Sequence, residues 1–181
     1  MRWRYSLVLL ICLLASRLSA QETPEAVAET LSRCLRDGDW AGAAHLMHPE
    51  ALGAMRTLFA PLMTGSQADE NARQLFGLGS AAELASTPDT VVFAHFLQSV
   101  TARAGLDQAL KGAQFTALGH VMGGGDTVLV VSHLTMTLQG ITLSSFEVMP
   151  FVLYEGHYRG LLKADFTNMA AVLKARLGRS Q

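Results

Sequence analysis

The sequence predicts an α+β domain in which N-terminal helices pack against a curved, four-stranded antiparallel sheet. Two observations support this class. Apolar residues recur at helical spacing from residue 21 to about residue 112, and from residue 114 onward they alternate with a period of two. Very short turn sequences separate the alternating segments, so we expect consecutive strands to pair as hairpins. A last helix is expected over residues 168–177.

The first 20 residues resemble a secretory signal peptide. Arg2 and Arg4 precede an apolar run over residues 7–15, and small residues end the segment at Ala20. This apolar run is far shorter than a membrane-spanning helix, which needs about 20 residues. We therefore expect a single domain over residues 21–181, secreted or periplasmic, with no integral membrane segment once the signal is removed. The residues before the cleavage point are imperfect for processing, which leaves an uncleaved anchor as the alternative.

Charge and cysteine content narrow the possible functions. Residues 1–20 hold three of the 14 basic residues and none of the 15 acidic ones, so the rest of the chain carries a net charge of about −4. This balance argues against a nucleic-acid-binding protein, which needs clustered basic charge. Cys34 is the only cysteine after residue 20, and its helical register with Leu31 and Leu35 predicts a buried, inert thiol.

Capping residues define the helices of the first half. Thr23 and Pro24 begin a helix that Gly38 closes, and Asp39 can cap the next, which carries Trp40 on its apolar side. On the same signals, together with helical spacing of apolar residues, we expect further helices over residues 49–62, 69–76, 81–85 and 88–104.

Four strands should follow the helices. Val, Thr, Phe and Leu dominate the alternating segments, which we place at Gln114–Met122, Thr127–Leu138, Ile141–Tyr154 and His157–Asp165. We take Gly124-Gly125, Gln139-Gly140 and Glu155-Gly156 as two-residue turns. Because the triple glycine at 123–125 joins strand to strand, a hairpin turn is favoured there over a phosphate-binding loop.

The stretch "HLMHPE" over residues 45–50 raises the question of a metal site. A zinc site needs a third and usually a fourth ligand, and the sequence offers none at a suitable spacing. Pro49 cannot continue a preceding helix. We therefore interpret His45 and His48 as parts of a joint between two helices, with His48 preceding the new helix start. No metal and no cofactor is predicted.

The assumed turns set a strand register and hence a core face. Ser132 and Glu147 then lie directly opposite each other in the middle of that face. The apolar members of the face are Phe115, Ala117, Val121, Val128, Val130, Leu134, Met136, Leu143, Met149, Phe151, Tyr158, Leu162 and Phe166.

Glu147 is the main candidate for a functional carboxylate. Burial of an ionised carboxylate raises its pKa unless partners hold the charge, so a protein that keeps one on an apolar face usually uses it. It could bind a polar ligand or act as a general base. The alternative is that Pro150, which cannot donate to the ladder, marks a bulge that shifts the register and puts Glu147 in water.

The opposite face of the sheet is expected to carry both polar and apolar groups. The last helix or a second subunit should cover part of it, and its histidines are expected to satisfy local hydrogen bonds. The residues assigned to this face are His120, Val131, His133, Val148, Val152, Arg159, Leu161, Lys163 and Asp165.

The stretch "GDWAGAAHLMHPEAL", the helical block with "TPDTVVFAHFL", and the four-strand ending together resemble the nuclear transport factor 2-like superfamily, which includes SnoaL-like cyclases and ketosteroid isomerases. The resemblance implies a conical α+β barrel with a pocket between the helices and the concave sheet face. It implies no catalytic activity, because the chain offers no match to the tyrosine and paired aspartates of the isomerases.

Two functions remain open at this stage. The first is an exported domain that binds a small apolar or amphipathic ligand or a protein partner, either an envelope protein or a second copy of itself. The second is an isomerase, dehydratase or cyclase in which Glu147 moves a proton next to Tyr158. The candidate ligand-binding residues are Glu147, Ser132, Tyr158 and Trp40.

Overall fold

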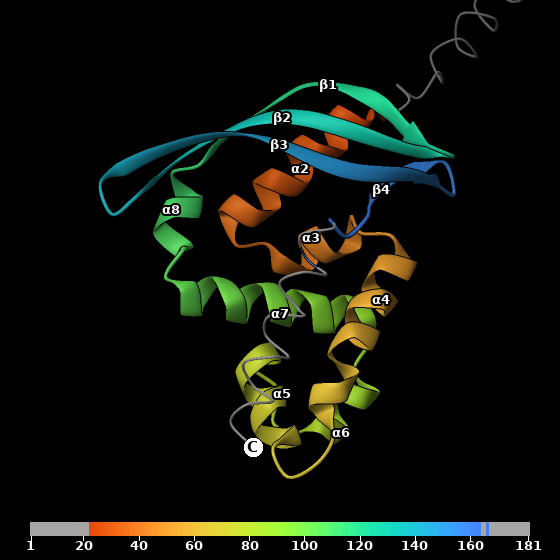
Figure 1. Ribbon diagram of the computed structural model, residues 1–181, viewed down its shortest axis with the longest axis vertical. Helices are drawn as coiled ribbons and strands as arrows, with labels where there is room; N and C mark the ends of the chain where they lie inside the picture. The colour runs from red at the N-terminus through yellow and green to blue at the C-terminus, as the bar shows by residue number, and fades with distance from the viewer. Residues whose placement is uncertain (1–21, 164–165, 167–181) are drawn as a thin grey trace, which may run out of the picture.

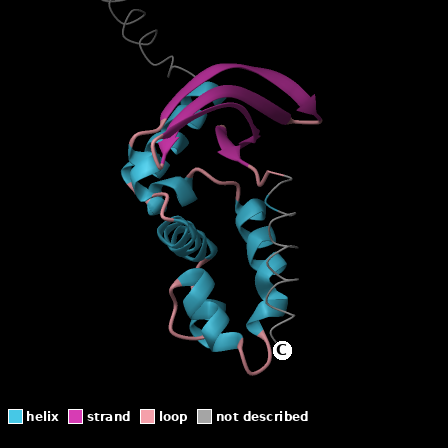
Figure 2. Ribbon diagram, turned by 60° about the vertical axis from the view of Figure 1, so that its left-hand side comes forward, coloured by secondary structure: helices cyan, strands magenta, loops and turns pink. Residues whose placement is uncertain are grey.

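The computed structural model describes residues 22–163 and residue 166. Within these residues the predicted α+β class is confirmed: helices lie on one side of a four-stranded antiparallel sheet, whose strand order is β1-β2-β3-β4 (Figure 1). The sheet is curved but does not close into a barrel (Figure 2). The expected signal peptide, Asp165 and the expected helix over 168–177 lie outside the described residues.

The first three helices begin at the predicted residues, and α2 also ends at its predicted cap. Helix α2 (Pro24–Asp37) has Thr23 as its N-cap, and Gly38 ends it in a left-handed conformation with a φ of 73°. Helix α3 (Trp40–His45) is capped by the carboxylate of Asp39, which accepts a hydrogen bond from the Gly42 amide. Helix α4 (Pro49–Phe59) starts at the proline after the predicted joint.

The remaining helices complete the layer below the sheet. Two predicted helical turns form α5 (Ala68–Phe76) and α6 (Ala81–Ser86), and the predicted long helix is α7 (Asp89–Ala104). The structure adds a short 3₁₀ segment, η1 (Ala60–Met63), where the helix predicted over residues 49–62 was expected to continue. It also contains a five-residue helix, α8 (Asp107–Lys111), which was not predicted.

The sheet consists of β1 (Gln114–Gly124), β2 (Thr127–Leu138), β3 (Ile141–Tyr154) and β4 (His157–Gly160). Two of the predicted turns, Gln139-Gly140 and Glu155-Gly156, are confirmed by the pairing of the residues that flank them. The first turn was placed one residue too early, because Gly124 pairs with Thr127 and leaves Gly125 and Asp126 as the turn.

Strand β1 departs from strict alternation, which corrects two predictions. The register shifts between Ala117 and Gly119, so the side chains after this bulge exchange faces. Val121, predicted in the core, is 55% exposed. His120, predicted on the outer face, instead lies 2.5 Å from the Glu25 carboxylate of α2, on the helix side.

Strand β4 ends five residues earlier than predicted, at Gly160. Beyond that point the alternation of faces no longer applies, and the prediction that Leu161 and Lys163 lie on the outer face is wrong. Leu161 faces a hollow on the helix side, and Lys163 contacts Glu147. The register between β2 and β3 is continuous through Pro150, so the alternative of a bulge there is also excluded.

The "HLMHPE" stretch joins two helices and is hydrogen-bonded to the end of β4 at Gly160. The Gly160 amide donates to the Leu46 carbonyl at 2.8 Å, and the His48 amide donates to the Gly160 carbonyl at 2.8 Å. The His48 ring accepts from the Glu50 amide at the start of α4 and packs edge-on against Tyr154. The predicted structural joint is therefore confirmed.

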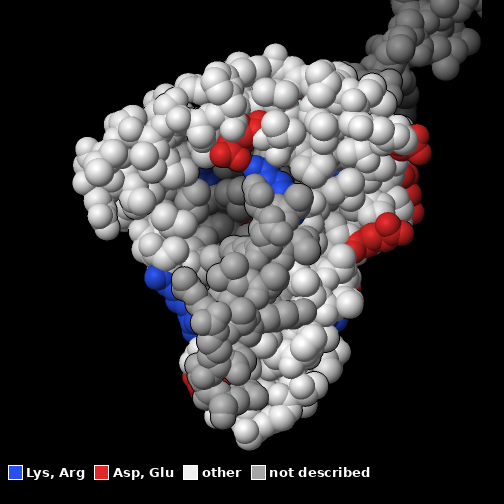
Figure 3. Space-filling view, viewed as in Figure 1, with Lys and Arg blue, Asp and Glu red and all other residues white. Residues whose placement is uncertain are grey.

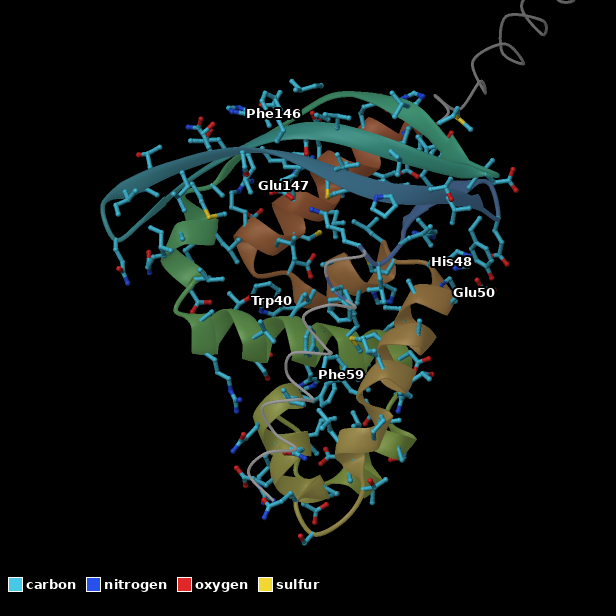
Figure 4. The ribbon with its side chains drawn as sticks, viewed as in Figure 1. Trp40, His48, Glu50, Phe59, Phe146 and Glu147 are labelled. Carbon is cyan, nitrogen blue, oxygen red and sulfur yellow. The ribbon has the colours of Figure 1, made fainter. Side chains whose placement is uncertain are left out.

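Two buried clusters hold the helices together and attach them to the sheet. The larger one, here called the helical wedge, fills the space between α4, α5 and α7, and its centre is formed by Phe59, Phe76 and Phe96. Figure 4 labels Phe59 among the helices below the sheet. The smaller one contains Val27 and Ala28 of α2, which pack on Val130 and Phe151 of the sheet. Helix α2 is thus fixed to the sheet by its N-terminal half.

Among the described residues, no helix combines the length and the apolar character that crossing a membrane would require.

Candidate ligand-binding site

The C-terminal half of α2 and the concave face of the sheet enclose a hollow of about 500 Å³, here called the α2 hollow. Its apolar wall comes from both layers, as helix α2 supplies Leu35, α8 supplies Leu110, and the sheet supplies Phe115, Leu134, Met136 and Met149. A volume of this size is within the range of small-molecule sites. The hollow exists because α2 packs tightly only at its other half, under Val130 and Phe151.

Glu147 lies in the α2 hollow, on the face predicted from the sequence (Figure 4). Its carboxylate accepts a hydrogen bond of 2.5 Å from the Lys163 ammonium and another of 3.2 Å from the Ser145 hydroxyl. The hydrogen bond from Lys163 lowers the pKa of Glu147 below its ordinary value of 4.5, and this effect outweighs the raising effect of burial. Glu147 is therefore ionised at neutral pH, with its charge held by Lys163.

The rim of the α2 hollow is polar. Helix α2 directs Glu29, Ser32, Arg33 and Arg36 to it, at positions that share one side of a helix. Figure 3 shows acidic and basic side chains meeting above a hollow beneath the sheet. These four residues were not predicted from the sequence. Their helical spacing marked a polar stripe, but spacing alone does not distinguish a stripe that borders a cavity from one that faces water.

Ser132 is fully buried opposite Glu147, as predicted. Its hydroxyl donates to the main-chain carbonyl of Glu147 at 3.2 Å, and not to the carboxylate. The hydroxyl is thus satisfied within the sheet, and Ser132 does not line the α2 hollow as the structure defines it.

Tyr158 and Trp40 are not brought together with Glu147. Tyr158 pairs with Leu153, which is six residues from Glu147 along β3, roughly 20 Å at about 3.3 Å per residue. Trp40 lines a separate groove between α3 and α7, with His45 and His95. The proposed proton transfer between Glu147 and Tyr158 therefore lacks the necessary geometry.

Local structural contacts involve His45, His133 and Cys34. His45 Nδ1 lies 2.7 Å from the Ala41 carbonyl, and His133 Nε2 lies 2.7 Å from the Ser144 hydroxyl. Cys34 is partly rather than fully buried, and burial followed by the nearby Asp39 charge raises the pKa of its thiol, which keeps it protonated. Within residues 22–163 and 166, no three His, Cys, Asp or Glu side chains are grouped to hold a metal ion.

The outer face of the sheet is apolar and exposed. Phe146 is 72% exposed and points away from the helices (Figure 4), and Val148 is 46% exposed beside it. The sequence between Asp126 and Glu147 contains no Asp, Glu, Lys or Arg. The outer face of β2 and β3 is thus an uncharged surface over most of its length.

Comparisons with protein-family models, with curated proteins and with solved structures find no match to this chain.

Proposed function

We propose that this protein binds a small amphipathic molecule in the α2 hollow. The single observation that carries the proposal is the combination of an apolar cavity wall with an ionised Glu147–Lys163 pair and a polar helical rim. Ligand sites generally combine a mainly apolar wall with a few polar groups that orient the ligand. The likeness to the nuclear transport factor 2-like superfamily and the export of the chain remain parts of this proposal, supported by the sequence patterns described above.

Binding is favoured over proton-transfer catalysis by the state of Glu147. A general base is most effective when its pKa lies near the working pH, whereas the hydrogen bond from Lys163 moves the pKa of Glu147 further below neutrality. The distance along β3 to Tyr158 also removes the partner that the enzymatic hypothesis assigned to it.

A fluorescence titration with anilinonaphthalene sulfonate, an amphipathic probe, tests the proposal. The wild-type protein should bind the probe saturably, and Leu134→Trp, which fills the α2 hollow, should weaken binding at least about tenfold, or about 1.4 kcal/mol. Leu118→Trp is the matched control, because Leu118 is exposed in the β1 bulge and lies outside the hollow. Thermal melts of all three proteins establish that they are folded. Equal affinity of the two variants would contradict the proposal.

Self-association through the outer sheet face is a second candidate, favoured by the uncharged surface around Phe146 and Val148. Charge depletion and exposed aromatic residues are typical of the centre of protein interfaces. Sedimentation velocity over a range of protein concentrations should then show a dimer that Phe146→Glu dissociates. A wild-type protein that stays monomeric at all concentrations would contradict this candidate.

A further inference from the structure

A second hollow adjoins the α2 hollow. It measures about 450 Å³ and lies between α2, α7, β3 and the segment after β4, and we call it the α7 hollow. Leu35, Met149 and Lys163 line both hollows. The two spaces therefore meet at the Lys163 side chain, beside its ion pair with Glu147.

The two hollows differ in chemistry. The α7 hollow has walls of Leu, Met, Phe, Pro and Gly, with Leu31, Phe93, Leu97, Phe151 and Leu161 among them, and Lys163 is its sole charged residue among those described. The α2 hollow has a charged rim on its helical side. A molecule that filled both would have an apolar part on one side of Lys163 and a polar part on the other.

The charges at the rim favour an acidic group. The charges of Lys163 and Glu147 neutralise each other, because the Lys163 nitrogen lies 2.5 Å from a Glu147 oxygen. The other charged residues that line the hollow are Arg33, Arg36 and Glu29, so positive charge is in excess there. Arg36 also contacts the adjacent Asp37, but both side chains are about half exposed, so that pair is weak. Guanidinium groups on successive helical turns suit a carboxylate or another oxyanion.

We propose that the occupant is a single-chain amphiphile with an acidic head, whose head binds at Arg33 and Arg36 and whose apolar chain passes Lys163 into the α7 hollow. This inference rests on the proposed function and names its ligand class. The α7 hollow then sets the length of chain that the protein accepts. Flexible Met149 at the junction allows the chain to pass because methionine adapts its shape readily.

Displacement of anilinonaphthalene sulfonate by saturated fatty acids from octanoate to palmitate tests the chain length, with all concentrations kept below those at which the acids form micelles. Because each buried methylene adds to binding, palmitate should bind at least about tenfold more tightly than octanoate. Leu97→Trp narrows the α7 hollow and should reduce this ratio of affinities at least about fivefold. Leu161→Trp narrows it from the opposite wall and serves if the first variant does not fold. The exposed control Leu118→Trp should keep the wild-type ratio.

Head-group preference is tested with the alcohol and the amine that have the same chain as palmitate. The acid should bind at least about tenfold more tightly than either, and the double variant Arg33→Gln/Arg36→Gln should remove this preference while the alcohol binds as before, because charge-assisted hydrogen bonds are lost only with the acid. Equal binding of acid and alcohol by the wild-type protein would overturn the assignment of an acidic head.

The two proposals fail in different ways. If the fluorescent probe does not bind saturably, the proposed function itself is wrong. If the probe binds but affinity does not depend on chain length, or both tryptophan variants fold and keep the wild-type ratio, the α2 hollow is a site and the α7 hollow plays no part in it.

Discussion

The helical wedge and the space beneath the sheet are both lined with apolar side chains, yet the wedge is filled and the space beneath the sheet is not. In the wedge, the rings of Phe59, Phe76 and Phe96 have centroids 5.2 to 5.8 Å apart. Beneath the sheet, aliphatic side chains such as Leu134 and Met136 face a hollow of about 500 Å³. We therefore expect stability to be concentrated in the wedge, while the proposed binding site lies where packing is incomplete.

The largest expected effect comes from opening the wedge. Phe59 is 1% exposed and contacts both other central rings, so Phe59→Ala should lower the free energy of unfolding by about 3–5 kcal/mol. Urea unfolding followed by circular dichroism measures the change. A loss below about 1 kcal/mol would show that the wedge is less tightly packed than its geometry indicates.

A matching truncation beneath the sheet should cost much less. Leu134 is only partly buried and already borders the α2 hollow, so Leu134→Ala creates little new cavity surface. We expect a loss of about 1 kcal/mol or less in the same urea experiment. Its affinity for anilinonaphthalene sulfonate should nevertheless fall, because the removed atoms belong to the cavity wall. The comparison between the two regions breaks down if both alanine variants lose the same stability.

The smallest expected effect concerns the ion pair between Glu147 and Lys163. Because the pKa of Glu147 is lowered in the folded protein, its stabilisation is present above pH 4.5 and is lost as the pH falls through the folded-state value. Lys163→Met removes this contribution, which we expect to be below about 1 kcal/mol because both side chains are about one-third exposed.

Urea unfolding of wild type and Lys163→Met between pH 7 and pH 3 measures that contribution. The stability difference between them should shrink as the pH falls below 4.5 towards the lowered pKa of Glu147. Glu25, whose pKa is also lowered, in its case by the hydrogen bond to His120, is the same in both proteins and cancels in the difference. A difference that stays constant over the range would mean that the pair does not stabilise the fold.

The sequence predicted the elements well because local signals define them. Thr23, Asp39 and Pro49 begin three helices through their own capping or conformational properties. The pairing of Ser132 with Glu147 followed from two-residue turns whose geometry is local. These predictions needed no knowledge of distant parts of the chain.

The predictions that failed depended on interruptions of a regular pattern. The bulge before Gly119 moved His120 and Val121 to faces opposite to those expected, and alternation alone does not reveal where an extra residue is inserted. Lys163 was misplaced because β4 ends at Gly160, after which a side chain can turn to either face. The partner of Glu147 was therefore missed, although its position on the concave face was predicted.

The hollows themselves could not be predicted from the sequence. A cavity forms where neighbouring elements do not pack in contact, and no residue pattern encodes that gap. The apolar pattern of Leu134, Met136 and Met149 is the same whether α2 packs on them or diverges from them. The polar residues at the rim, such as Arg33, were not predicted for the same reason. Only the three-dimensional arrangement distinguishes a polar helix face that borders a cavity from one exposed to bulk solvent.

The hydrogen bonds between the α3–α4 joint and Gly160 restrict where another strand can join the sheet. They occupy the outer edge of β4 at Gly160, so a foreign strand cannot pair at that point. Strand β3 pairs with β4 only over Phe151–Tyr154, so among the described residues two edges have no strand partner: the outer edge of β1 and the edge of β3 before Pro150. An added strand would therefore begin pairing at one of these two edges.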